Sequence, residues 1–358
     1  MKMILSIEDS RYYMKKKREV ISAIGFIICF LLLFTYTTSL IMPKGNAKFD
    51  NVKRMDTFYR QPKNTIDVLF LGASTIRNGI SPLTMWEEFG FTSYVRATSS
   101  QSPMITYYYL LETLKYQSPK VVIIDGGSLL QTGLKVDENE PSNRKAIDPM
   151  RFSLIKLNLI FDMQSHSENQ TIISYLFPIL RYHDRWKDIT KIDFTNDRYD
   201  PYKGQYVVFT NEPADIPNDF MEHVGTASDP VEEVYFYHKK IIDLCKQKGI
   251  ILIYLDLPRL NKSTYSKYLS VKNFAAKNDV IYINYSFPEI LEEVGFDPLT
   301  DLENSNHLNT FGSIKFSRHL ASYLESQFTL PNRKNSDVAA QWDEDYRIFE
   351  RQIEEHSN

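Results

Sequence analysis

A serine follows the first buried-looking segment of the chain. Residues 66–71 (IDVLFL) read as a strand and lead into Gly72, Ala73, Ser74 and Thr75. In open α/β sheets, ligands bind outside the carboxyl ends of the strands, so Ser74 lies where a nucleophile is useful. The small residues before it permit a tight turn. A serine in such a turn also serves as a helix cap, so Ser74 alone does not define a site.

A histidine stands in a polar, acid-containing segment near the end of the chain. This segment runs from Asp301 to Asn309 (DLENSNHLN), contains His307, and leads into the last expected helix. In a doubly wound fold it returns to the sheet edge that carries Ser74. Nucleophilic catalysis by serine needs a base within hydrogen-bond reach and a group that orients the imidazole. The segment offers both.

Five short apolar segments predict a parallel sheet covered on both faces. They comprise residues 66–71, 92–97, 120–125, 250–255 and 279–284. Helical patterns separate or follow them, at residues 83–89, 104–116, 230–248, 264–277 and 310–327. This alternation predicts a three-layer α/β/α, flavodoxin-like domain with five parallel strands over residues 65–330.

An insert of roughly a hundred residues, about 130–229, interrupts the alternation after the third strand. Its Asp-, Asn-, Pro- and aromatic-rich sequence is too long for a plain loop, so we expect a lid or subdomain with helices near 152–161 and 170–180. The charged C-terminal segment 331–358 is either a solvated tail or a helix with a stripe formed by Trp342, Tyr346, Phe349 and Ile353.

Residues 21–42 carry no charge over 22 positions, enough to cross a hydrocarbon core about 30 Å thick. Lys15, Lys16, Lys17 and Arg18 precede them, so the positive-inside rule keeps residues 1–20 in the cytoplasm and places the rest outside. A cleaved signal peptide is the alternative. The long apolar run and the lack of a clear cleavage site favour a single-pass anchor in a bacterial cell membrane, followed by a stalk over residues 43–64.

The LGAST element at residues 71–75 and the HLN-x-x-G element at 307–312 resemble the SGNH (GDSL-like) hydrolase superfamily. The resemblance covers about residues 66–328. It is strongest to the membrane-anchored extracytoplasmic branch with DltD-like and AlgJ-like proteins. It implies a flavodoxin-like sheet, with Ser74 as the nucleophile and His307 as the base.

Three departures from the family pattern concern the rest of the site. Asn304 stands where the family has Asp; it can hold an imidazole tautomer, and Asp301 or Glu303 could supply the charge. Ala97 replaces a glycine after the second strand, but its N–H and that of Ser74 could still form an oxyanion hole. The family's G-x-N-D block is absent after the third strand.

Other polar residues are candidates for substrate binding. Gln101 and Arg77 could face the pocket beside Ser74, and Arg77 could hold a phosphate or carboxylate. His183 and Arg185, within the insert's YHDRW segment, could contact a glycan or an anion. Solvated surface is the default interpretation of Gln101 and Arg77, and packing of its Trp and Tyr in the core explains the YHDRW segment at least as well. Neither a metal-ligand spacing nor a glycine-rich phosphate loop occurs, so no metal and no cofactor are expected.

The expected function is acyl-ester chemistry at the outer membrane face. The substrate would be an acetyl or D-alanyl ester on a cell-envelope polysaccharide or teichoic acid, with a membrane-embedded acyltransferase as a possible partner. The net charge of −3 gives no support for nucleic-acid binding. The alternatives are a catalytically weak binding or assembly module for an envelope polymer, favoured by Asn304, and a purely structural surface protein.

Overall fold

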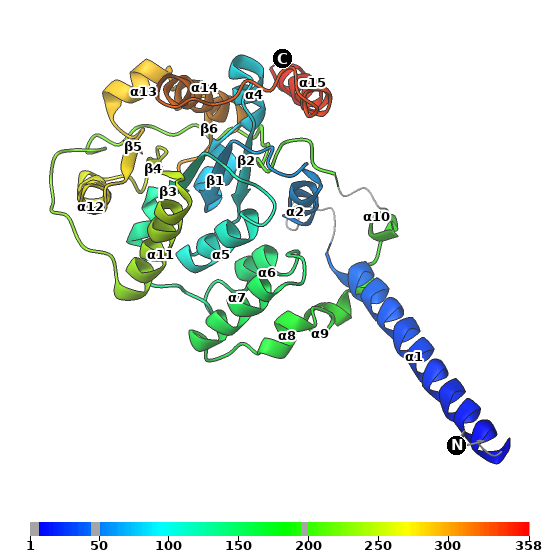
Figure 1. The fold of residues 1–358 in the computed structure, drawn as a ribbon. Helices are drawn as coiled ribbons and strands as arrows, with labels where there is room; N and C mark the ends of the chain where they lie inside the picture. The colour runs from blue at the N-terminus through cyan, green and yellow to red at the C-terminus, as the bar shows by residue number, and fades with distance from the viewer. Residues whose placement is uncertain (1–6, 44–50, 195–198, 358) are drawn as a thin grey trace.

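The computed structural model describes residues 7–43, 51–194 and 199–357 and is built around one parallel sheet (Figure 1). The strands are β1 (Val68–Gly72), β2 (Ser93–Ala97), β3 (Val121–Asp125), β4 (Ile251–Asp256) and β5 (Ile281–Asn284), in the order β2-β1-β3-β4-β5. This is the flavodoxin-like order. All five predicted strands are confirmed, with ends shifted by at most two residues.

Side chains that alternate along the strands enter two separate cores, one on each face of the sheet. Leu69 and Leu71 of β1 pack with α5 (Pro103–Thr113) and α11 (Glu232–Lys248). Val68 and Phe70 face the opposite side and pack with α14 (Thr310–Gln327). Because both faces are covered, the strands are apolar along their whole length. The predicted three-layer α/β/α fold is confirmed.

The remaining helices of the domain lie around this sandwich. They are α3 (Ser74–Gly79), α4 (Pro82–Phe89), α12 (Tyr265–Lys277) and α13 (Pro288–Val294).

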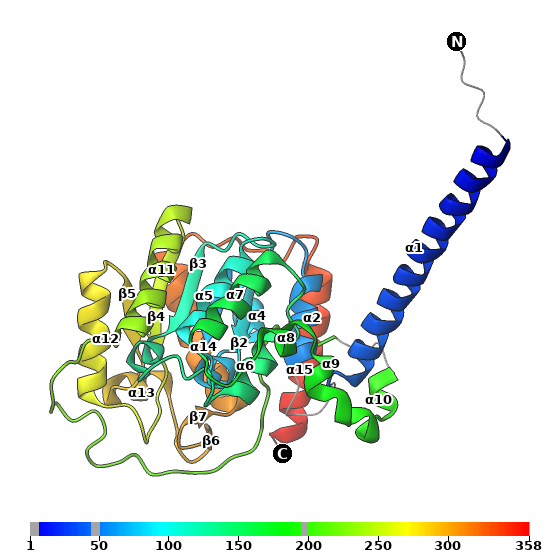
Figure 2. The same cartoon turned by 90° about the horizontal axis from the view of Figure 1, so that it is seen from below.

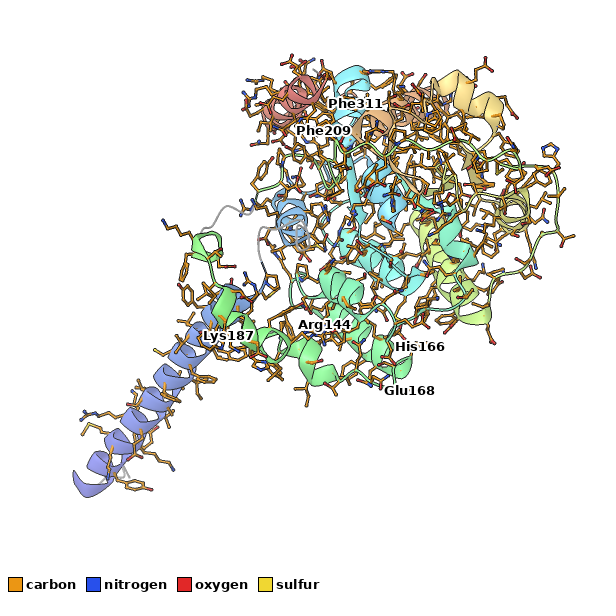
Figure 3. The ribbon with its side chains drawn as sticks, turned by 180° about the vertical axis from the view of Figure 1, so that it is seen from behind. Arg144, His166, Glu168, Lys187, Phe209 and Phe311 are labelled. Carbon is orange, nitrogen blue, oxygen red and sulfur yellow. The ribbon has the colours of Figure 1, made fainter. Side chains whose placement is uncertain are left out.

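The first part of the insert after β3, up to residue 194, forms a helical subdomain beside the sandwich, whereas residues 199–229 run along the sandwich without helix or strand (Figure 2). It contains η1 (Gly126–Leu130), α6 (Glu140–Ile147), α7 (Leu154–Ser165), α8 (Ile172–Leu176), α9 (Ile179–Tyr182), η2 (His183–Asp188) and α10 (Lys191–Phe194). Its far end contacts the N-terminal helix α1 (Ile7–Ile41), which projects from the rest of the molecule. Figure 3 shows Lys187 beside α1, whereas Arg144 and Glu168 lie in the body of the insert.

Two terminal segments pack more closely than the sequence predicted. Residues 51–60, expected within the stalk, form α2 (Asn51–Arg60), and its Met55 and Phe58 are buried in the core. Their i, i+3 spacing gives the helix an apolar face. Residues 339–356 form α15 (Ala339–His356), which packs on α4 through Trp342 and Trp86. The helical-stripe alternative therefore describes this end of the chain, and the solvated tail does not.

Candidate active site

Ser74 is held at the carboxyl end of β1 by a tight turn. Gly72 ends the strand with φ of +153°, and a Cβ there would lie 2.8 Å from the Cβ of Asp125. Ser74 is the first residue of α3, so its N–H has no acceptor within the helix. The turn thus presents a hydroxyl and a backbone N–H in the same place.

His307 lies on a short hairpin that the sequence did not predict. Strands β6 (Leu302–Asn304) and β7 (His307–Leu308) pair antiparallel, and Asn304 lies opposite His307. The backbone N–H of Asn306 donates to Oδ1 of Asn304 at 3.0 Å and closes the turn. Asn304 and His307, three residues apart in the sequence, therefore lie side by side across the hairpin.

The structure brings Ser74, His307 and Asn304 into one hydrogen-bonded chain. Ser74 Oγ lies 2.8 Å from His307 Nε2, and His307 Nδ1 lies 3.1 Å from Asn304 Oδ1. An amide oxygen only accepts hydrogen bonds, so it favours the tautomer with the proton on Nδ1. Nε2 is then free to accept the proton of the serine.

The surroundings of His307 keep its imidazole neutral. Burial, reinforced by the nearby cations Arg77, Lys262 and Arg259, lowers the pKa of His307 to about 4. A neutral imidazole is the form that acts as a base, although a low pKa makes that base weak. The site is therefore in the base form at pH 7, but it offers little stabilisation to an imidazolium ion.

Glu303 is the acid nearest to the imidazole. Its Oε2 lies 4.0 Å from His307 Nδ1 and accepts a 2.6 Å hydrogen bond from Nδ2 of Asn78 on α3. Burial raises the pKa of the Glu303 carboxyl, against the effects of Arg77 and Asn78. Glu303 thus places a carboxylate behind the imidazole without a direct hydrogen bond to it.

Asp301, the other acid considered as an orienter, is used elsewhere. Its carboxylate accepts from Lys315 Nζ and from the backbone N–H of Asp297, both at 2.8 Å. Its backbone oxygen accepts from Asn309 N at 3.0 Å. Asp301 therefore fastens the hairpin to α14 rather than holding the imidazole.

Three further candidates lie near the serine turn. Arg77 donates to Ser99 Oγ at 2.8 Å and stacks on the ring of Tyr206 at 4.5 Å, so it borders the site from α3. Ala97 pairs with Gly72 in the sheet register at the end of β2. Gln101 is buried, and its side chain accepts from Thr98 in the same loop and donates to Thr106 in α5. Gln101 therefore holds that loop together.

The insert candidates are not part of this site. Arg185 donates to the carbonyl oxygens of Ile41 and Met42, at 2.9 and 3.2 Å, and so caps the end of α1. His183 is exposed, and its Nδ1 bonds to Leu180 O at 3.0 Å. Both belong to η2, which packs against α1.

Residues at and after the ends of β3 and β4 complete the same edge of the sheet, and they were not among the site residues expected from the sequence. Burial raises the pKa of Asp125 to about 6, while Arg259 and the N–H groups of Gly127 and Ala73 act to lower it. Arg259 and Lys262 follow β4. Ligands bind at the carboxyl ends of the strands in such folds, so the same rule that marked Ser74 could also have marked Asp125, Arg259 and Lys262. Across the described ranges, no cluster of His, Cys, Asp or Glu side chains could hold a metal ion.

Comparison with known proteins finds distant similarity at the level of solved structures. No protein-family model matches the chain, and no curated protein matches it significantly. Among solved structures, a GDSL-like lipase from Bacteroides thetaiotaomicron is similar over 78% of this chain and 100% of its own, with 11% identity and a TM-score of 0.36. The geometry of the site therefore carries the functional argument.

Proposed function

We propose that this protein is a membrane-anchored serine esterase or O-acyltransferase of the SGNH type, acting on acetyl or D-alanyl esters of cell-envelope polymers. The observation that carries the proposal is the 2.8 Å contact between Ser74 Oγ and His307 Nε2, with Asn304 on the other side of the ring. Nucleophile, base and orienter occur in the order that acyl transfer requires.

The reaction follows from these positions. His307 Nε2 takes the proton as Ser74 Oγ attacks the ester carbonyl, and the oxyanion that forms faces the N–H of Ser74 and the end of β2 at Ala97. Collapse breaks the bond to the leaving alcohol, which receives the proton from His307. Water, or a hydroxyl of an acceptor polymer, then attacks the acyl-serine and regenerates the enzyme. A membrane-embedded acyltransferase partner could supply the acyl group.

The N-terminal helix supports the membrane part of the proposal. Residues 12–41 are long and apolar enough to span a bilayer, and none of the most apolar stretch is buried. Phe177 of the insert packs edge-on against Phe34 of α1 at 5.9 Å. Leu180 and Trp186 are more than half exposed nearby, as expected for side chains at a membrane interface. The lysines before the apolar stretch favour a cytoplasmic N-terminus.

A second candidate function, binding of an envelope polymer without catalysis, is favoured by two features of the site. An amide at position 304 and the low pKa of His307 would also suit a catalytically weak module that binds an envelope polymer. Such a module keeps the fold without activating Ser74.

A fluorophosphonate probe separates the two functions, because it reacts only with an activated serine. We expect the full chain, purified in detergent, to be labelled at Ser74 and to hydrolyse 4-nitrophenyl acetate. Ser74→Ala should lower the hydrolysis rate by at least about 10³-fold. Ser118→Ala, an exposed serine before β3, is the matched control and should behave as the unmodified chain. An unlabelled but folded protein would favour the binding module.

A further inference from the structure

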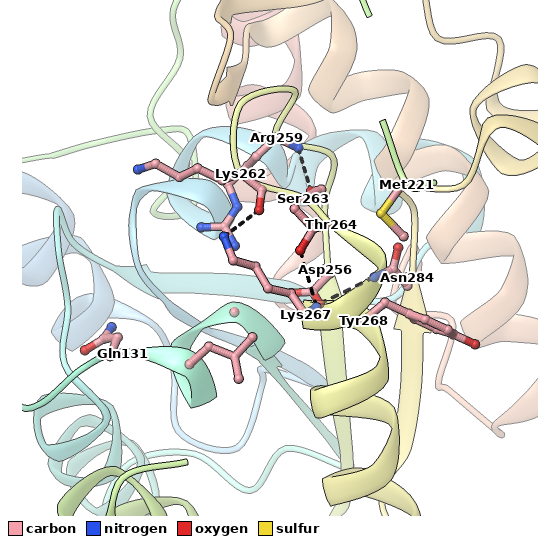
Figure 4. Close-up of a pocket in the computed structure, with 12 residues that line it drawn as sticks. Gln131, Met221, Asp256, Arg259, Lys262, Ser263, Thr264, Lys267, Tyr268 and Asn284 are labelled. Carbon is pink, nitrogen blue, oxygen red and sulfur yellow. Dashed lines mark hydrogen bonds between the residues drawn. The ribbon is translucent and has the colours of Figure 1, made fainter. Parts of the chain in front are cut away.

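A basic cavity opens beside the candidate active site, on the far side of β3 from Ser74. It has a volume of about 160 Å³ and is lined by residues that follow β3 and β4 and by the start of α12. Figure 4 shows Arg259, Lys262 and Lys267 among its side chains, together with Ser263 and Thr264. We refer to this cavity, defined by Arg259, Lys262 and Lys267, as the basic cavity.

The cations of the basic cavity outnumber the acids that face them. Asp256 lines the cavity and Asp125 lies next to it, so three cations meet two buried carboxylates. The pKa of Lys267 is lowered by burial and then by Arg259 and Lys262. Crowded positive charges of this kind are relieved by an anion.

Arg259 has unused hydrogen-bonding capacity at this position. Its Nε is buried and has no hydrogen-bond partner within the described part of the chain. A buried guanidinium N–H without an acceptor costs free energy, and guanidinium groups are well suited to bind oxyanions. Gly127 permits the approach of Arg259, since a Cβ there would lie 2.3 Å from Nη2.

The basic cavity is physically coupled to the Ser74–His307 pair. Asn261, in the loop between Arg259 and Lys262, donates to Ser305 Oγ in the turn of the β6–β7 hairpin at 2.5 Å. Arg259 and Lys262 are also close enough to help depress the pKa of His307. On the other side, Asp125 links the serine turn to Gly127, whose N–H donates to Asp125 Oδ1 at 3.0 Å. These contacts place the loops that form the basic cavity next to the serine turn and the β6–β7 hairpin.

We propose that the basic cavity is an anion subsite, which binds a phosphate or carboxylate of the same molecule whose ester Ser74 attacks. This rests on the proposed function and narrows it to anionic substrates. The planar guanidinium of Arg259 can donate hydrogen bonds to two oxygens of the anion, and Lys262 adds a second positive charge to the cavity lining. Binding energy from this remote group would hold the ester carbonyl at Ser74 Oγ.

Matched esters test the selectivity for an anion. We expect kcat/KM for 1-O-acetylglycerol 3-phosphate, or for an O-acetylglycerate, to exceed that for 1-O-acetylglycerol by about tenfold or more. Arg259→Gln should reduce this ratio about tenfold, and Lys262→Gln should reduce it less. Lys277→Gln, which removes an exposed cation at the other end of α12, is the matched control and should leave the ratio unchanged. Equal ratios in Arg259→Gln and the unmodified chain would overturn the proposal.

A binding measurement keeps this test separate from catalysis. In the Ser74→Ala variant, calorimetry should detect glycerol 3-phosphate or glycerate, and the added Arg259→Gln substitution should abolish that binding. Binding of one and not the other identifies the anion. If neither binds to a folded Ser74→Ala protein, the subsite is wrong even when the esterase is active. If binding is seen without ester turnover, the subsite stands and the esterase assignment fails.

Discussion

Asn304 and His307 face each other across the β6–β7 hairpin, with 3.1 Å between Oδ1 of the amide and Nδ1 of the imidazole. The amide fixes the ring and its tautomer, but it brings no negative charge to an imidazolium ion. Orientation and charge are thus divided between two residues, because the Glu303 carboxylate lies farther off, at 4.0 Å. We therefore expect weaker stabilisation of the imidazolium ion, and slower ester cleavage, than a carboxylate in direct contact with the ring would give.

Substitutions at Asn304 test orientation and charge separately. Asn304→Asp should raise kcat/KM for an acetyl ester about tenfold, because a carboxylate stabilises the imidazolium that forms in the transition state. Asn304→Ala should lower it about 10–100-fold, because the ring loses the partner that holds it. Steady-state rates with 4-nitrophenyl acetate measure both. The Asn304→Asp gain must vanish in the Ser74→Ala background; a gain that persists would come from another nucleophile.

Glu303 should act on His307 through charge alone. Glu303→Gln keeps an oxygen for the hydrogen bond from Asn78 but removes the negative charge. We expect a loss of kcat of a few-fold, about 1 kcal/mol or less for a partly exposed pair, with little change in KM. The pKa of His307, read from the acidic limb of the pH–rate profile, should fall further because a nearby negative charge has been removed. An unchanged profile would show that Glu303 only fastens α3 to the hairpin.

The pH dependence of labelling should follow the depressed pKa of His307. The imidazole is protonated, and therefore useless as a base, only near and below its pKa of about 4. The rate of fluorophosphonate labelling should rise with pH through about 4 and be flat from about pH 6 to 8. An ordinary histidine would place the rise near 6.5. A midpoint near 6.5 would show that burial and the three cations do not depress the pKa of His307.

Buried histidines should also make the fold sensitive to acid. Burial lowers the pKa of His238, between Ser128 and Tyr254, to about 4. Between pH 6.5 and 4 the unfolded chain protonates this histidine and the folded chain does not. His238 therefore makes the free energy of unfolding fall as pH falls through this window, whereas the raised pKa of Asp125 acts in the opposite direction. Denaturant unfolding at several pH values measures it. His238→Gln should reduce the slope, whereas Ser118→Ala should leave it unchanged.

The sheet and the residues Ser74 and His307 were predictable from the sequence, but the surroundings that set the orientation and pKa of His307 were not. Continuous apolar strands and alternating helices carry strong local signals, and the LGAST and HLN-x-x-G elements, which resemble those of SGNH hydrolases, marked Ser74 and His307. The β6–β7 hairpin was not predictable, because strands as short as Leu302–Asn304 form only when they pair with a partner strand. Glu303 was one of the acids considered beside His307, and the end of β4 marked the region of Arg259 and Lys262. The distances of these side chains from the imidazole depend on tertiary packing, which sequence spacing does not encode. Arg185 looked like a ligand contact, yet it caps the end of α1.

The C-terminal helix α15 provides a test of packing that the sequence left open. Trp342 is almost fully buried, its ring lies 5.2 Å from that of Trp86, and the ammonium of Lys203 lies 4.5 Å from its centre. Trp342→Ala should lower the free energy of unfolding by about 3–5 kcal/mol, as expected for a large aromatic side chain removed from a core. Tyr346→Ala, on the same helix but partly exposed, is the matched control and should cost much less. Denaturant unfolding of the full chain in detergent measures both. Equal and small losses would mean that residues 339–356 detach from α4 in solution.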